Sequence, residues 1–299
     1  MTVQKRYSDL GGDAGSNIVG QVMEQRDRVR SRMAHVARTV AVMSGKGGVG
    51  KSVITANLAA ALAARGHAVG ALDADLSGPC LARMLGAGEQ SLRIGERGVV
   101  PAGGVGGVRV MSMDLLLAGD ETPLVWDDLD GAARAGDVWR GAMELSALRE
   151  FLADTDWGEL DFLFIDLPPG TQPLAALTAL LPELDGVIVV SIPSDVARLV
   201  VGKSVTAARE RRTPILGLVE NMAGYHCQRC GEVGELFPAP AGQAPAAEAL
   251  GVPSLGQVPF DPGLARSADG GRPFILDAGD SPAARALTEI VDRIEQLPG

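Results

Sequence analysis

Two cysteines, Cys227 and Cys230, stand three positions apart in the stretch "ENMAGYHCQRCG", residues 220–231. Thiolates at this spacing bind zinc or iron, or cycle between dithiol and disulfide. A zinc ion or a four-iron cluster takes about four protein ligands, so one pair is half a site. His226 adjoins Cys227, and its side chain tends to point elsewhere. A redox dithiol normally begins a helix, whereas this pair follows "NMAGY" in a stretch predicted to be turn-rich. Zinc and redox chemistry both remain open at this point.

A second candidate site is the glycine-rich segment "MSGKGGVGKS", residues 43–52, which follows an apolar run and opens a predicted helix. That context is the one a phosphate-binding loop requires. Lys51 is predicted to neutralise β- and γ-phosphate charge, and the Ser52 hydroxyl to bind Mg²⁺. A second lysine, Lys46, lies in the same loop, and its repulsion from Lys51 is offset only if the negative charge of a polyphosphate lies nearby. The glycines that let backbone N–H groups converge on phosphate are Gly45, Gly47, Gly48 and Gly50.

Carboxylates follow two later apolar runs. Asp73 and Asp75 occur in "LDAD", and Asp166 occurs in "FIDLPPGT". Ligands of α/β proteins gather at the carboxyl ends of strands, so these groups are candidates for Mg²⁺ binding and for orienting the attacking water. We expect Asp166 to hold Mg²⁺ through water, and Gly170 to let the loop after it approach the γ-phosphate.

Short apolar runs alternate with helical patterns along the chain, which predicts an α/β fold with a doubly wound, mostly parallel sheet and helices on both faces. The predicted strands begin at residues 39, 68, 108, 161, 186 and 215, and the predicted helices cover 51–65, 143–155, 193–212 and 281–297. We expect residues 1–35 to form a tail and a helix, and residues 36–299 a single domain with its cysteine segment at 220–237. Residues 118–141 and 237–249 are expected to be surface excursions.

Composition restricts the class of protein. The 299 residues include 27 Lys and Arg against 37 Asp and Glu, a net charge of −10, which disfavours nucleic acid as a partner. No apolar run is long enough to cross a bilayer and no signal-peptide pattern is present, so we expect a cytoplasmic protein without a membrane partner. With three cysteines, the chain is not a disulfide scaffold, and Cys80 is interpreted as a small buried side chain.

These motifs resemble those of the deviant-Walker ATPases, the MinD- and ParA-like P-loop NTPases, whose loop carries the extra lysine found here as Lys46. Within that superfamily the chain is similar to the Mrp/ApbC-type iron–sulfur cluster carriers. The blocks that carry the resemblance run from about residue 38 to 298: "SGKGGVGKS", "LDADLSGP", "RMLG", "VWRGAM", "DWGELDFLFIDLPPGT", "ENMAGYHCQRCGE" and "VPFDP".

The resemblance implies roles for individual residues. Lys46 would reach the phosphates of the other subunit in a homodimer, Asp73 and Asp75 correspond to the switch I pair, and Asp166 to the switch II aspartate. Cys227 and Cys230 would be the cluster ligands. The remaining nucleotide-binding positions that it implies are Gly45, Gly47, Gly48, Val49, Gly50, Lys51, Ser52, Val53, Asn221 for the adenine, and Pro259 and Asp261 beside the base.

Three departures from the family pattern stand out. Val53 replaces a threonine whose hydroxyl meets the α-phosphate, a loss of about 1 kcal/mol if one hydrogen bond is missing. "PPGTQP" replaces the usual "PPGTGD", and the insertion at 127–137 has no counterpart in the family.

A symmetric dimer would supply the missing ligands, because a two-fold axis brings both cysteine pairs together. The chain is therefore predicted to be a Mg²⁺-dependent ATPase that, as a homodimer, assembles a bridging 4Fe–4S cluster and passes it to apo-proteins, with cluster scaffold proteins as further partners. Two alternatives remain: a MinD/ParA-like spatial regulator, and a nucleotide-binding scaffold with weak hydrolysis.

Overall fold

In the computed structural model, which describes residues 18–117, 136–227, 229–237 and 245–297, strands and helices alternate along most of the chain. The strands are β1 (Thr39–Ser44), β2 (Val69–Asp73), β3 (Arg93–Gly95), β4 (Gly98–Val100), β5 (Ala102–Gly103), β6 (Arg109–Met111), β7 (Phe162–Asp166), β8 (Gly186–Ser191), β9 (Ile215–His226), β10 (Val233–Gly234) and β11 (Ser254–Phe260). The helices are α1 (Ile18–Met33), α2 (Lys51–Ala64), α3 (Leu81–Met84), α4 (Gly136–Asp154), α5 (Gln172–Leu180), α6 (Asp195–Glu210), α7 (Ala246–Leu250), α8 (Pro262–Asp269) and α9 (Pro282–Glu295).

One sheet organises these elements. Its order is β10-β9-β8-β1-β7-β2-β6-β5, and β11 also pairs with β9. β1 lies parallel to β7 on one side and to β8 on the other, while β5 and β10 are antiparallel to their neighbours. Parallel neighbours need crossover connections, which here run through helices. The prediction of a doubly wound, mostly parallel α/β sheet is confirmed.

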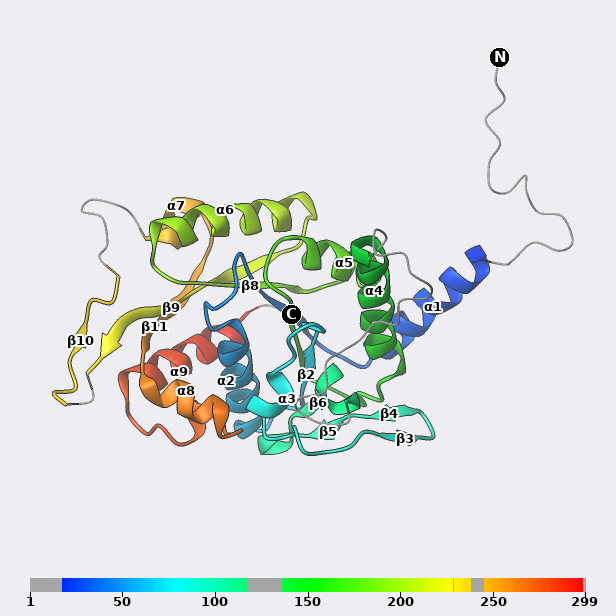
Figure 1. The fold of residues 1–299 in the computed structure, drawn as a ribbon, viewed down its shortest axis with the longest axis horizontal. Helices are drawn as coiled ribbons and strands as arrows, with labels where there is room; N and C mark the ends of the chain where they lie inside the picture. The colour runs from blue at the N-terminus through cyan, green and yellow to red at the C-terminus, as the bar shows by residue number, and fades with distance from the viewer. Residues whose placement is uncertain (1–17, 118–135, 228, 238–244, 298–299) are drawn as a thin grey trace, which may run out of the picture.

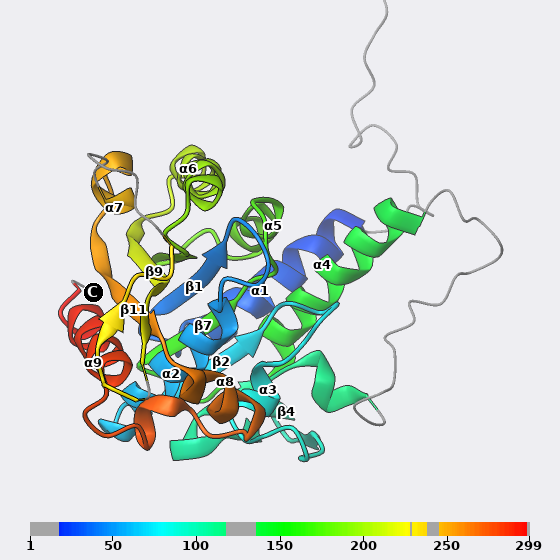
Figure 2. The same cartoon turned by 60° about the vertical axis from the view of Figure 1, so that its left-hand side comes forward.

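Helices cover both faces of the sheet, because alternate residues of its buried strands point to opposite sides. In β1, Val40 and Val42 join a core with α2, α8 and α9, whereas Ala41 and Met43 join a second core with α1, α4, α5, α6 and α7. Figure 1 shows α6 and α7 above the sheet and α2, α8 and α9 below it. The view of Figure 2 shows α1 and α4 running side by side.

The N-terminal helix is part of this packing. Val29 and Met33 of α1 are buried in the second core. Its polar face is held by ion pairs, among them Arg28 with Asp154 and Arg32 with Asp156. These ion pairs help dock α1 onto the domain.

Some elements differ from the sequence-based expectation. The strand predicted from residue 215 was expected to end near residue 219, yet β9 continues to His226, because β11 and β10 both pair with its second half. The insertion at 127–137 and the excursion from 237 lie largely outside the described residues. No helix within the described ranges is long and apolar enough to cross a bilayer.

The C-terminal helix should be essential to stability, since Leu287 of α9 is fully buried in the first core. We expect Leu287→Ala to lower the free energy of unfolding by about 2 to 5 kcal/mol, as cavity-forming substitutions do. Ile94→Ala, at a side chain that is 90% exposed, should change it by less than about 0.5 kcal/mol. Urea unfolding of the two variants checks this, and equal effects would contradict the packing described.

Candidate functional site

The glycine-rich loop bends between the end of β1 at Ser44 and the start of α2 at Lys51. Gly48 and Gly50 have φ angles of 76° and 82°, the left-handed region that favours glycine. At Gly50 the reason is also steric, because a Cβ atom there would lie 2.2 Å from Nδ2 of Asn221. The loop and the N-terminus of α2 thus have the geometry that binds phosphate.

Asp166, at the end of β7, gathers the polar side chains of α2. Its carboxylate accepts from Nζ of Lys51 at 2.6 Å, from Oγ of Ser52 at 2.5 Å, and from Oγ1 of Thr55 at 2.7 Å. Lys51 is 7% exposed and Asp166 is fully buried, so the charge pair is shielded from water. A hydroxyl beside a carboxylate at the start of a P-loop helix is a donor set that suits Mg²⁺. The structure therefore brings together the two residues predicted to hold that ion.

The switch I carboxylates differ in burial. Asp73 is fully buried and accepts from the backbone N–H groups of Cys80 at 2.8 Å and Leu81 at 2.9 Å. Burial, together with the nearby charge of Asp166, raises the pKa of Asp73 to about 7. Asp75 is half-buried, and burial raises its pKa too. Asp75 is consequently the carboxylate of the pair that water can reach, while Asp73 shapes the loop.

The loop after Asp166 returns to the phosphate loop. The N–H of Gly170 donates to the carbonyl of Ser44 at 2.8 Å, and the φ of Gly170 is 108°. A Cβ atom at Gly47 would lie 4.0 Å from Pro169. Lys46, half-buried, is positioned in the same bend by a hydrogen bond from the Ser44 hydroxyl to its carbonyl. The predicted switch II segment is therefore next to the position expected for terminal phosphates.

Asn221 lies on the other side of the phosphate loop. Its Nδ2 donates to the carbonyl of Val49 at 2.9 Å, whereas its buried Oδ1 has no hydrogen-bond partner. A buried unpaired acceptor is costly unless a ligand satisfies it, and an exocyclic amino group such as that of adenine would do so. Pro259 is on the neighbouring strand β11, paired with β9. Val53 packs against the first core from α2.

The cysteine pair forms a tight turn after β9. The carbonyl of Cys227 accepts from the N–H of Gly231 at 2.8 Å, and the N–H of Cys227 donates to the carbonyl of Glu232 at 2.9 Å. The backbone N–H groups of Cys230 and Arg229, and then the Cys230 thiol, point at the Cys227 sulfur and lower the pKa of Cys227. Amides aimed at one sulfur favour the thiolate, which is the metal-binding form.

His226 does not join the cysteines as a ligand. Its Nδ1 lies 2.7 Å from Oδ2 of Asp261, and the side chains are only 14% and 5% exposed. Asp261 also caps α8 by accepting from the N–H of Gly263 at 2.7 Å. Within the described part of the chain, no group of three or more His, Cys, Asp and Glu side chains could hold a metal ion. One described chain therefore offers two thiolates and no complete zinc site.

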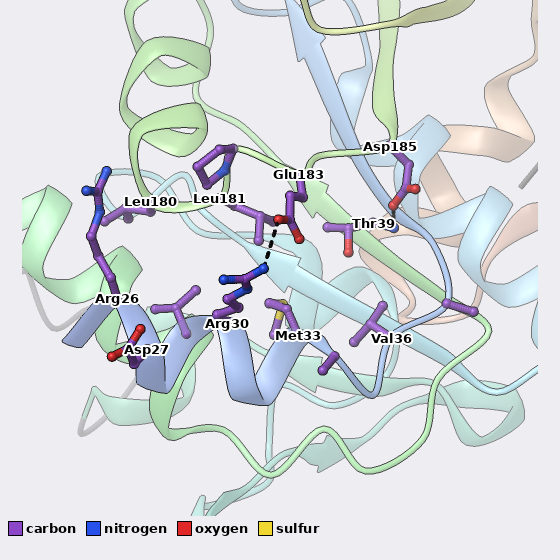
Figure 3. Close-up of a pocket in the computed structure, with 14 residues that line it drawn as sticks. Arg26, Asp27, Arg30, Met33, Val36, Thr39, Leu180, Leu181, Glu183 and Asp185 are labelled. Atoms are coloured by element: carbon purple, nitrogen blue, oxygen red, sulfur yellow. Dashed lines mark hydrogen bonds and ion pairs between the residues drawn. The ribbon is translucent and has the colours of Figure 1, made fainter. Parts of the chain in front are cut away.

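A cavity of about 670 Å³ lies far from this chemistry. Figure 3 shows Arg30 of α1 and Glu183 pointing toward one another across it, at 3.5 Å, with Thr39 and Asp185 at its other end. Thr39 begins β1, so this cavity is at the amino ends of the strands, whereas the phosphate loop follows their carboxyl ends. In parallel sheets ligands bind at the carboxyl ends. We assign this cavity no nucleotide.

Three site residues escaped the sequence reasoning. Thr55 follows Lys51 by four positions, one helical turn, and this spacing alone could have placed it on the same face. Ser112 comes near Asp73, at 3.5 Å, from the distant strand end of β6. Cys80, expected to be a small buried side chain, is half-buried and its thiol interacts with Ser52. Only the packing of elements that are separate in the sequence reveals the last two.

The cysteines should differ sharply in reactivity, because burial, followed by the charge of Asp73, raises the pKa of Cys80 to about 11. With iodoacetamide near pH 7.5, Cys227 should be alkylated before Cys80. The Cys80 rate should rise about tenfold per pH unit up to about pH 11, while the Cys227 rate should reach half of its maximum below the ordinary thiol pKa of 9.0. Peptide mass spectrometry over a pH series measures both rates, and equal rates at pH 7.5 would contradict the assigned environments.

Comparison with known proteins agrees with this geometry. A family model described as the ParA-type NUBPL iron-transfer P-loop NTPase matches residues 35–295. An iron–sulfur cluster carrier protein of Saccharolobus solfataricus is 42% identical over 271 residues, covering 90% of this chain and 87% of that protein. The cytosolic Fe–S cluster assembly factor NUBP2 of Bos taurus is 41% identical over 265 residues, covering 88% and 93%.

Solved structures extend the likeness to three dimensions. A nucleotide-binding protein of Archaeoglobus fulgidus in complex with ADP has a TM-score of 0.70 and 32% identity, covering 86% of this chain and 95% of that one. The cell division ATPase MinD of Pyrococcus furiosus, with a TM-score of 0.58 and 24% identity over 88% of this chain and all of that one, shares the fold. The phosphate loop, the switch carboxylates and these matches lead to one conclusion: the chain belongs to the NUBPL iron-transfer P-loop NTPases, the family of iron–sulfur cluster carriers and assembly factors.

Proposed function

We propose that this chain binds and hydrolyses ATP and, as a homodimer, carries a 4Fe–4S cluster between the Cys227–Cys230 pairs of two subunits for transfer to apo-proteins. The observation that carries the proposal is the exposed two-cysteine turn, whose amides favour the thiolate and which has no further metal ligand in the described residues. A four-iron cluster takes about four thiolates, and an isologous two-fold interface supplies four from two identical pairs.

For the nucleotide, different residues of the chain would bind the phosphates, the magnesium ion, the attacking water and the base. The backbone of the phosphate loop would receive the phosphate oxygens, and Lys51 would move from Asp166 toward the γ-phosphate charge. Ser52 and Asp166 would hold Mg²⁺, which supplies neutralising charge on the β- and γ-phosphates. Asp75, the more accessible switch I carboxylate, would orient the attacking water, and Asp73 would keep its loop in place. Asn221 would accept a hydrogen bond from the base through its unpaired Oδ1, near Pro259 and Asp261.

Lys46 is proposed to act across the dimer. It lies in the bend of the loop next to Lys51, where its charge is favourable only when phosphate is nearby. Because a lysine at developing phosphate charge stabilises the transition state, a subunit that lacks a partner would hydrolyse slowly. ATP would thus favour the dimer that holds the cluster, and hydrolysis would favour its release.

Two alternatives share the fold. A MinD/ParA-like spatial regulator has no use for the cysteine turn, and a scaffold without hydrolysis has no use for the accessible Asp75 beside the phosphate loop. ATP-dependent co-sedimentation with liposomes or DNA would favour the first, and phosphate release no faster than in the Lys51→Gln variant would favour the second.

Cluster binding is tested by anaerobic reconstitution with iron and sulfide. We expect brown, dimeric protein with about four irons per two chains. Cys227→Ala combined with Cys230→Ala should abolish the visible thiolate-to-iron absorption, while Cys80→Ala, the matched control at the third cysteine, should keep it. Absorption that survives the double substitution, or a brown monomer, would contradict a cluster that bridges two subunits.

Hydrolysis is tested at Lys46. We expect Lys46→Ala to slow phosphate release at least about tenfold, since phosphate-contacting cations supplied in trans contribute that much or more. Lys203→Ala, at an exposed lysine on α6, should leave the rate unchanged. Mixing Lys46→Ala with the Lys51→Gln variant should restore part of the activity if the lysine acts across subunits, because one of the two sites then has both lysines. No recovery in the mixture would argue for action within one subunit.

A further inference from the structure

The strand β9 connects the nucleotide site to the cysteine pair, but its ladder is interrupted between them. Asn221 contacts the phosphate loop, and Cys227 directly follows the end of the strand. In the pairing with β11, Asn221 is opposite Val258 and Tyr225 is opposite Phe260, so four steps on β9 match two on β11. Met222 within this irregularity has a φ of 57°. Such a bulge bends a strand, so the backbone ladder alone does not hold the cysteine turn in register with the phosphate loop.

Beyond the bulge, a side chain fixes the end of β9. The His226–Asp261 hydrogen bond, at 2.7 Å between largely buried groups, joins the residue before Cys227 to the first turn of α8. Asp261 binds its own helix with its other oxygen, through the N–H of Gly263. The Asp261 carboxylate therefore links α8 to His226, beside the pairing and ring stacking of Phe260 with Tyr225. Figure 1 shows the end of β9 and β10 projecting from the body of the molecule beyond α8 and α9.

From α8 the contacts continue to the switch I loop. α8 packs against α3, and the turns that follow the two helices approach so closely that a Cβ atom on Gly86 would lie 2.7 Å from the carbonyl of Gly271. α3 begins at Leu81, whose N–H is bonded to Asp73. A contiguous series of packed elements and hydrogen bonds thus runs from the switch I aspartate through α3, α8 and Asp261 to His226 and the cysteine turn.

We propose that His226 is a positioning residue that couples the cysteine pair to the nucleotide site through Asp261, α8, α3 and Asp73. The inference rests on the proposed function, and it names the route by which nucleotide occupancy changes the cysteine turn. A side-chain link of this kind carries coupling only if both sites bias it, and the coupling is reciprocal. The cysteine turn should therefore respond when nucleotide rearranges the loop that Asp73 holds.

The test compares alkylation of Cys227 and Cys230 in the reduced, cluster-free protein with and without magnesium and a non-hydrolysable ATP analogue. In the wild type, we expect the faster of the two alkylation rates, with and without the analogue, to exceed the slower at least about fivefold, the lower end of common coupling energies. In His226→Ala the ratio of these two rates should fall to about one. His226→Asn should retain most of the effect, because its Nδ2 can occupy the place of the imidazole Nδ1 and donate to Asp261. If the role of His226 were purely structural, His226→Ala would change the rates with and without the analogue by the same factor and leave their ratio unchanged.

Two further variants keep the result interpretable. His226→Phe preserves a ring without the donor, so it isolates the hydrogen bond if His226→Ala fails to fold. His35→Ala is the matched control, since His35 forms a 2.8 Å pair with Glu159 on an exposed surface away from the site, and it should keep the wild-type ratio. The inference is overturned if the wild-type ratio is about one, or if folded His226→Ala or His226→Phe keeps the wild-type ratio.

Failure of this inference is distinguishable from failure of the proposed function. A protein that becomes brown on reconstitution and releases phosphate, yet shows no nucleotide effect on its cysteines, overturns the coupling alone. If alkylation responds to nucleotide through His226 but the protein never takes up a cluster, the coupling holds and the proposed iron–sulfur cluster is contradicted.

Discussion

The rest of the site depends on the buried carboxylate of Asp166. It receives Lys51, Ser52 and Thr55, all from the first two turns of α2, and so fixes the helix that follows the phosphate loop to the strand next to β1. An ionised carboxylate in a buried position is tolerated only when it is paired and hydrogen-bonded, and here three donors satisfy it. The same arrangement keeps a cation and a hydroxyl ready for phosphate and magnesium, so stability and chemistry have one origin.

Asp73 and Asp166 show how environment separates residues of the same type. Asp166 faces Lys51, whereas Asp73 is equally buried but satisfied by backbone amides, and its pKa is raised to about 7. Asp73 and Asp166 are partners in the pairing of β2 with β7, which explains why the charge of one affects the other. Asp73 also holds the start of α3 through the N–H of Leu81, and α3 packs against α8.

The cysteine turn provides only part of a metal site. Its amides favour the thiolate at Cys227, its sulfurs are partly or fully exposed, and its neighbouring histidine is bound to Asp261. A structural zinc site closes four ligands within one fold, whereas this turn presents two at the end of a projecting strand. That geometry suits a cargo shared between chains and released, and it is consistent with the family to which the chain belongs.

The sequence by itself determined the fold class, the phosphate loop and the cysteine pair, because each depends on a local pattern. These patterns are short apolar runs that alternate with helical patterns, glycines between a strand and a helix, and two thiols three positions apart. It placed five of the principal strands within about two residues of their observed bounds, but ended β9 early, because the partners that extend it to His226 come from later in the chain. Only the tertiary structure decided that Ser112 lies near Asp73, that Cys80 interacts with Ser52, and that the partner of His226 is Asp261. Those outcomes arise from contacts between residues far apart in sequence, where side-chain direction and burial, and not residue spacing, select the partner.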